Sequence, residues 1–99
     1  MAVKVLIKRK FKDGKLNEAS KLFNQARYKA MSQQGYISSE TLSSCDDPNN
    51  VVVVSMWQGI ENWNQWKESD LREENEAEFE ALLVGPTEYE TYNLGLPIQ

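Results

Sequence analysis

The segment Val-Val-Val-Val-Ser-Met-Trp at residues 51–57 constrains the fold more than any other part of the chain. Side chains alternate between the two faces of a β-strand, so a strand over this segment would carry apolar groups on both faces. The preceding residues 46–50, Asp-Asp-Pro-Asn-Asn, are a strong turn signal and predict a hairpin with a Ser- and Thr-rich strand over residues 36–45. A strand that is apolar on both faces has to be covered on both sides.

The rest of the chain changes between strand-like and helix-like patterns. Residues 3–12 alternate apolar side chains with lysines, which is typical of a half-buried strand. Residues 15–33 repeat apolar side chains with helical spacing. Two further helices are predicted over residues 60–67 and 70–83, and a last strand over residues 88–94. The predicted order is therefore βαββααβ.

This order predicts a single α+β domain over residues 1–99, of the ferredoxin-like type, with all helices on one face of one antiparallel sheet. The other face of the sheet is left uncovered. A large exposed apolar patch is uncommon on a soluble monomer, and so short a chain buries a limited share of its surface. The sheet of a second copy is the simplest cover, so we expect a homodimer.

The contents of histidine and cysteine limit the chemistry. The chain has no histidine and a single cysteine, Cys45, so nearly every common Zn, Cu or Fe site and any intrachain disulfide are excluded. We therefore expect no metal and no cofactor. No signal peptide or membrane-length apolar run is recognisable, which favours a cytoplasmic protein without a membrane span. The net charge of −4 argues against non-specific nucleic-acid binding, although residues 1–30 hold nine of the Lys and Arg residues.

Four features along the chain carry a resemblance to a known family. They are Gly35-Tyr36, the turn Asp47-Pro48-Asn49, the valine strand that ends in Met56-Trp57, and the spacing from Trp57 to Trp66 and Ser69. In these features the chain resembles the antibiotic-biosynthesis-monooxygenase family, whose members are dimeric ferredoxin-like α/β barrels. The resemblance implies either a cofactor-independent oxygenase that acts on polycyclic phenols or quinols, or a haem-degrading enzyme.

The haem-degrading branch of that family uses an Asn on the first strand, a Trp on the short helix and a His on the next helix. Trp66 matches the tryptophan, but the resemblance places Ile7 at the position of the Asn and Glu76 at the position of the His. Haem degradation is therefore not expected. The phenol-oxidising branch relies on substrate acidity, shape and a few Asn, Trp, Arg or Tyr side chains, which this chain retains.

Candidate binding residues come from aromatic and polar side chains in apolar surroundings. Trp63 and Trp66 lie three positions apart on the predicted short helix, so both rings can face one cleft and stack on a flat ligand, with filling of the core as the alternative. Asn75 falls on the helical face of Leu71, Phe79 and Leu82, whereas the glutamates of residues 73–80, Glu76 among them, are expected to face solvent.

Both inward polar residues, Asn75 and Arg9, need partners. A buried amide is costly unless it is hydrogen-bonded, so Asn75 bonds either to a neighbouring backbone or to a ligand. Arg9 shares its strand face with Ile7 and Phe11. Its partner is either a phenolate or carboxylate of a ligand or a glutamate of the acidic third helix.

We therefore predict a small-molecule-binding dimeric α/β barrel and, more specifically, a cofactor-independent monooxygenase that acts on an aromatic phenol or quinol. The predicted catalytic residues are Trp66, Asn75 and Arg9, and the predicted ligand-binding residues are Trp63, Phe23, Ile7 and Phe79. The alternative is a non-catalytic module that binds a metabolite or a partner protein through its basic first strand and acidic third helix. Turnover of a phenol under oxygen distinguishes the two hypotheses.

Overall fold

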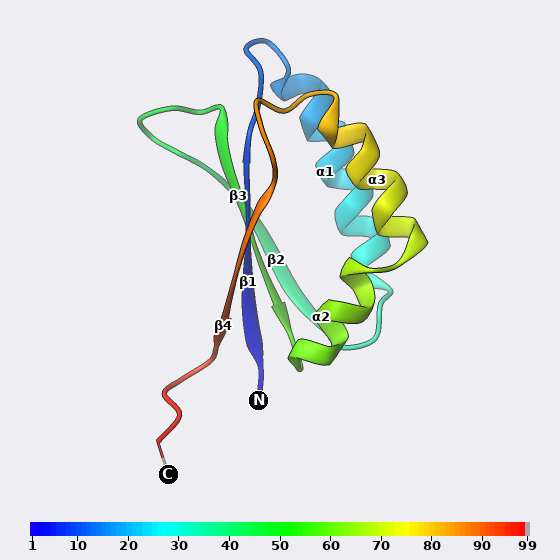
Figure 1. Ribbon diagram of the computed structural model, residues 1–99, viewed down its shortest axis with the longest axis vertical. Helices are drawn as coiled ribbons and strands as arrows, with labels where there is room; N and C mark the ends of the chain where they lie inside the picture. The colour runs from blue at the N-terminus through cyan, green and yellow to red at the C-terminus, as the bar shows by residue number, and fades with distance from the viewer. Residues whose placement is uncertain (99) are drawn as a thin grey trace.

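The computed structural model describes residues 1–98 of the chain. Its elements follow the order β1 (Val3–Lys10), α1 (Leu16–Met31), β2 (Tyr36–Ser43), β3 (Asn50–Trp57), α2 (Ile60–Lys67), α3 (Asp70–Glu80) and β4 (Glu88–Asn93). The four strands form one antiparallel sheet with the order β2-β3-β1-β4. All three helices lie on the same side of this sheet (Figure 1), which confirms the predicted ferredoxin-like α+β fold.

The register of the two central strands decides which side chains lie under the helices. On β1, Val5 pairs with Ser55 of β3 and Ile7 pairs with Val53. Val5 is fully buried and Ser55 is 5% exposed, so this row belongs to the covered face. Because side chains alternate along a strand, Arg9 lies on that same face, beside the helices.

Two hydrophobic clusters fill the space between helices and sheet. The first is centred on three tryptophans, Trp57, Trp63 and Trp66, and the second on Phe11 and Phe79. Full burial of an apolar side chain of this kind stabilises the fold by roughly 1.5–3 kcal/mol. The alanines of α1 contribute small surfaces, since Ala30 packs into the first cluster and Ala19 into the second. The predicted apolar stripe of this helix is confirmed.

A glycine at the end of α1 permits the close approach of α2. Gly35 has a φ of +85°, in the left-handed region that favours glycine. A Cβ atom at this position would lie 2.2 Å from Cγ of Asn62 on α2. The chain therefore needs glycine here both for its backbone conformation and for space.

The third helix differs in detail from the prediction. Its N-cap is Ser69, whose Oγ accepts a hydrogen bond of 3.3 Å from the backbone N–H of Arg72. The regular helix ends at Glu80, three residues earlier than expected. Leu71, predicted to face inward, is 46% exposed, and Arg72 faces inward in its place at 6%.

Among the described residues 1–98, no helix covers the second face of the sheet. On β3 this face is formed by half-buried Val52, Val54 and Met56, and on β1 by half-buried Leu6. Both faces of β3 are thus apolar, as predicted. Within residues 1–98, no helix is long and apolar enough to span a bilayer, and no three His, Cys, Asp or Glu side chains are grouped to hold a metal ion.

Candidate functional site

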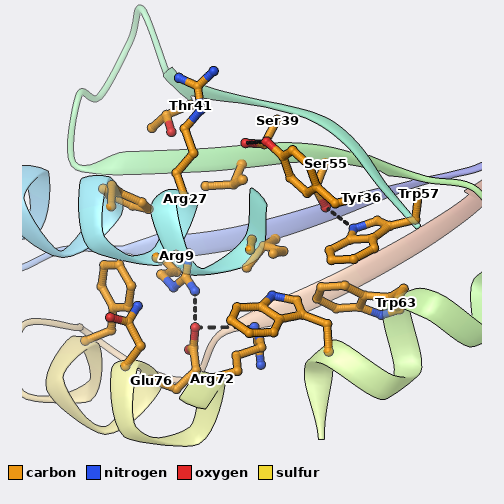
Figure 2. A pocket seen from close by; sticks show the side chains of 18 residues that line it. Arg9, Arg27, Tyr36, Ser39, Thr41, Ser55, Trp57, Trp63, Arg72 and Glu76 are labelled. Atoms are coloured by element: carbon orange, nitrogen blue, oxygen red, sulfur yellow. Dashed lines mark hydrogen bonds and ion pairs between the residues drawn. The ribbon is translucent and has the colours of Figure 1, made fainter. Parts of the chain in front are cut away.

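A cavity opens between the covered face of the sheet and the three helices (Figure 2). Its free volume is about 60 Å³, with further open space at the mouth, which is less than the volume of most small-molecule sites. All four buried polar residues of the part of the chain that the structure describes, Arg9, Ser55, Arg72 and Asn75, line it. Buried polar groups are costly, so their collection around one hollow marks it as the candidate site.

The structure brings all seven sequence-predicted site residues to this cavity. They are Ile7 and Arg9 from β1, Phe23 from α1, Trp63 and Trp66 from α2, and Asn75 and Phe79 from α3. Asn75 is 3% exposed, so the inward orientation inferred from the helical pattern is confirmed. The roles of these residues in binding or catalysis stay predictions.

Aromatic rings form one wall of the cavity. Trp63 lies between two rings, with centroid distances of 6.0 Å to both Trp57 and Tyr89. Its ring is therefore largely engaged in the core. Trp66 also lines the cavity and forms no such ring pair within residues 1–98. Of the two predicted tryptophans, Trp66 is the one whose ring has no aromatic neighbour to compete with a ligand.

A charged cluster packs against these rings, with the guanidinium carbon of Arg72 at 5.2 Å from the ring centroid of Trp63. Arg9 donates from Nη2 to Oε1 of Glu76, and Nη2 of Arg72 forms an ion pair with the same oxygen at 3.3 Å (Figure 2). Arg72 Nη2 also donates to the hydroxyl of Tyr89 at 2.8 Å. The Arg9 guanidinium carbon lies 4.2 Å from the ring centroid of Phe79, within the range of cation–π attraction. One carboxylate thus holds two buried guanidinium groups in place.

Glu76 is where the sequence-based interpretation was wrong. We expected it on the solvated side of α3, but its side chain is only 18% exposed and reaches the cavity. The inward stripe of α3 is Arg72, Asn75, Glu76 and Phe79, which has the spacing i, i+3, i+4, i+7 of a helix face. The pairing of Arg9 with a glutamate of α3, one of the two alternatives, is confirmed.

Two buried polar atoms at this wall have no hydrogen-bond partner within the described residues. They are Nε of Arg9 and Oδ1 of Asn75. Burial lowers the pKa of Arg9, and the neighbouring Arg72 lowers it further, whereas Glu76 opposes the shift. A guanidinium stays protonated in proteins, so Arg9 presents a charged N–H donor that the protein itself does not use.

Hydroxyl groups line the cavity near β2 and β3. The hydroxyl of Tyr36 lies 2.7 Å from Oγ of Ser39, and Trp57 donates from Nε1 to Oγ of Ser55 at 3.2 Å. Thr41 and Arg27 also line the cavity and are exposed, so the mouth lies between β2 and α1. Sequence reasoning missed these residues as well as Arg72 and Glu76. The i, i+4 spacing of Arg72 and Glu76 beside Asn75 was the available signal.

The fold and the cavity define a ferredoxin-like α+β domain with a polar, partly buried cavity between helices and sheet. The model of the antibiotic biosynthesis monooxygenase family matches residues 2–74. The chain therefore belongs to the antibiotic biosynthesis monooxygenase family. No curated protein matches the chain at a significant level.

Solved structures share this fold over nearly the whole chain. A conserved protein from Methanosarcina mazei Go1 is 21% identical, with a TM-score of 0.87, over 93% of this chain and 91% of its own. SnoaB, a cofactor-independent oxygenase from Streptomyces nogalater, is 14% identical, with a TM-score of 0.85, over 98% and 96%. Rv0793 from Mycobacterium tuberculosis is 14% identical, with a TM-score of 0.84, over 99% and 100%. At these identities the similarity establishes the fold.

The residues around the cavity do not fit a haem. The resemblance placed a haem-ligating His at position 76, but Glu76 occupies it and its carboxylate is engaged by Arg9 and Arg72. Ile7, at the position of the Asn, offers no hydrogen bond. The whole chain contains no histidine that could replace the missing ligand.

Proposed function

We propose that the protein is a cofactor-independent monooxygenase that oxidises an aromatic phenol or quinol inside the cavity. One observation carries this proposal: an unused donor, Arg9 Nε, and an unused acceptor, Asn75 Oδ1, in a cavity walled by tryptophans. A buried polar atom without a partner costs about 1–3 kcal/mol. A ligand that supplies the missing partners recovers this cost.

A phenol has the matching chemistry. The oxygen of a phenol or phenolate can accept a hydrogen bond from Arg9 Nε, and in a singly ionised quinol the second oxygen keeps its O–H and can donate to Asn75 Oδ1. The flat ring of such a ligand can stack against Trp66 and Phe23. The positive charge of Arg9 favours the ionised hydroxyl, because charges interact strongly in a site shielded from water.

The ionised substrate is electron-rich and can react with dioxygen directly. The phenolate gives one electron to dioxygen, the resulting radical pair recombines as a C–O bond, and the peroxide anion takes up the proton that the phenol released on ionisation. Loss of water from this hydroperoxide leaves a quinone. For an anthrol, one dioxygen is consumed, one of its oxygen atoms enters the product and the other leaves as water. The protein's part is to ionise and orient the substrate in a dry slot. The family and the likeness to SnoaB support this chemistry.

The homodimer belongs to the same proposal. The open sheet face of Leu6, Val52, Val54 and Met56 is continuous with exposed Leu42 and Tyr92, which are 50% and 52% exposed. A second sheet packed face to face would remove this apolar surface from water. The single exposed thiol, Cys45, suits the reducing cytosol, where we place the protein.

The proposal is tested by incubating the purified protein with anthrols and hydroquinones under oxygen. We expect quinone formation with uptake of one dioxygen per anthrol, transfer of one ¹⁸O atom from ¹⁸O₂, and no loss of rate with a chelator. Heat-denatured protein gives the background rate. Turnover no faster than this background across the panel would contradict the enzyme, and ligand binding without turnover would favour the non-catalytic binding module.

A further inference from the structure

The charges inside the cavity do not balance. Arg9 and Arg72 are each 6% exposed, and a single carboxylate, that of Glu76, bonds to both through the same oxygen. Of the 18 residues of the described chain that line the cavity, Glu76 is the only acidic one. Two buried positive charges and one negative charge leave one positive charge without a counter-ion.

Nearby surface charges do not close this gap. Glu73 and Glu80 line a groove on the outer side of α3, which shares Arg72 and Glu76 with the cavity. Both are exposed, and neither forms an ion pair with Arg9 or Arg72 within residues 1–98. Arg27 at the mouth is exposed too and adds positive charge. Solvent screens exposed charges, so their effect on the buried cluster is small.

The cluster has one free donor. Arg9 donates from Nη2 to Glu76, and Arg72 Nη2 pairs with Glu76 and donates to Tyr89, whereas Nε of Arg9 has no partner within residues 1–98. The Arg9 guanidinium is held against Phe79, at 4.2 Å from the ring centroid, and faces Phe23 at 5.6 Å. An anion bound at Arg9 Nε would therefore lie beside an aromatic ligand slot and complete the charge balance.

We infer that the cavity selects a planar aromatic ligand with one negative charge, and that Glu76 determines this number by neutralising the second guanidinium. A neutral ligand leaves one buried cation unpaired, and a doubly charged ligand leaves one buried anion unpaired, and both states are costly. The inference deepens the proposed function on which it rests, because it specifies a singly ionised phenol or quinol as the substrate. Arg72 and Glu76 become specificity-determining residues.

A ladder of ligands with nearly the same shape tests the charge selection. The probes are 2-naphthamide, 2-naphthoate and naphthalene-2,3-dicarboxylate, with charges of 0, −1 and −2 at neutral pH, and calorimetry measures their dissociation constants. None of them is a phenol, so oxidation does not interfere. For the wild-type protein we expect 2-naphthoate to bind at least about 10-fold more tightly than the other two, since an unpaired buried charge costs more than the ~1.4 kcal/mol of a tenfold change.

Three variants move the preference along this ladder. Glu76→Gln removes the negative charge, so naphthalene-2,3-dicarboxylate should become the preferred ligand. Arg72→Met removes one positive charge, so 2-naphthamide should become the preferred ligand. The double variant Arg72→Met/Glu76→Gln has the original charge and should again prefer 2-naphthoate. If Glu76→Gln alone does not fold, Arg72→Met and the double variant provide the same comparison. The matched control is Glu73→Gln, an exposed residue of the same helix, which should keep the wild-type order.

The outcomes separate the inference from the proposed function. An unchanged ligand order in the variants, an equal effect of Glu73→Gln, or a double variant that does not restore the wild-type order would overturn the charge selection. Absence of binding by all three probes would overturn it as well. If the protein oxidises phenols but binds the three probes with similar dissociation constants, the monooxygenase proposal holds and the charge selection is wrong. If the probes bind in the expected order but no phenol is oxidised, the cavity is a binding site for aromatic monoanions and the monooxygenase proposal is wrong.

Discussion

The two faces of the sheet use the same strands for different purposes. On the covered face, Arg9 has a side chain that is 4% exposed and serves a cavity. Its neighbour Lys8, on the open face, is 43% exposed and pairs with Glu90 at the surface. Adjacent cations on one strand thus differ completely in environment. The covered face retains polar groups inside a completed core, whereas the open face combines apolar side chains of β3 with charged side chains such as Lys8 of the central strand β1.

The largest expected effect concerns the core of the covered face. Trp63→Ala should lower the free energy of unfolding by about 3–5 kcal/mol, because it removes a large buried side chain and leaves a hole. Urea titration followed by circular dichroism measures this. Tyr28→Ala is the control, since Tyr28 is 80% exposed and its loss should change stability by less than about 0.5 kcal/mol. A loss below 1 kcal/mol for Trp63→Ala would show that its ring is not part of the core.

A charged substitution on the open face should weaken formation of the proposed dimer without preventing folding of the monomer. Val54→Lys introduces a charge opposite Glu40 of β2, which can pair with it in the monomer. Burial of the same lysine between two sheets is costly, so the dimer dissociation constant should rise at least about 100-fold. Sedimentation at micromolar concentration measures the mass. A wild-type particle of 11.4 kDa would contradict the dimer, and a Val54→Lys dimer as tight as the wild type would show that this face is not its interface.

A substitution in the cavity of the covered face should lower the rate of the proposed reaction. Arg9→Met should lower kcat/KM for phenols roughly 100-fold, because the ionised hydroxyl loses its positive partner. The variant should fold, since Arg72 and Glu76 remain as a balanced pair. Lys8→Met changes the adjacent residue on the open face and is the matched control. Equal rates for Arg9→Met and Lys8→Met would exclude a role of Arg9 in catalysis.

The smallest effect belongs to the surface pair of the open face. Lys8 lowers the pKa of Glu90 below its usual 4.5, and Glu90 raises the pKa of Lys8 above its usual 10.5, through their hydrogen bond. The contribution of Glu90 to the stability of the fold is present above pH 4.5 and is lost as the pH falls through its lowered pKa. The contribution of Lys8 to this stability is present below pH 10.5 and is lost as the pH rises through its raised pKa.

Both groups of this pair are solvated, so salt should screen the interaction. We expect the thermal stability of Glu90→Gln and the wild type to differ slightly at pH 7 in low salt, and the difference to shrink as the pH falls below 4.5 or as salt is added. Differential scanning calorimetry measures the melting temperatures. A difference that persists in high salt would mean that the pair is more buried than its side-chain exposures of 43% and 40% imply.

Much of the site was predictable because it lies on regular elements. Alternation along β1 placed Ile7 and Arg9 on one face, and the short spacing of Trp63 and Trp66 placed them along one side of α2. The pattern of α3 predicted the wrong inward direction for part of this helix. Leu71 suggested one inward direction, but the cap at Ser69 and the packing of Phe79 selected another, with Arg72 and Glu76 inside. Successive helical residues point about 100° apart, so an error of one position moves a side chain from core to solvent.

The sequence by itself determined the order of the elements, the two apolar faces of β3 and the absence of histidine chemistry. These properties follow from local periodicity, turn residues and composition, which do not depend on distant parts of the chain. Only the tertiary structure decided that Glu76 lies between Arg9 and Arg72, and that an atom of Arg9 remains unpaired. Arg9 and Glu76 are 67 residues apart. Their contact arises because β1 and α3 enclose the same low-dielectric space, where a buried charge has to find an opposite charge.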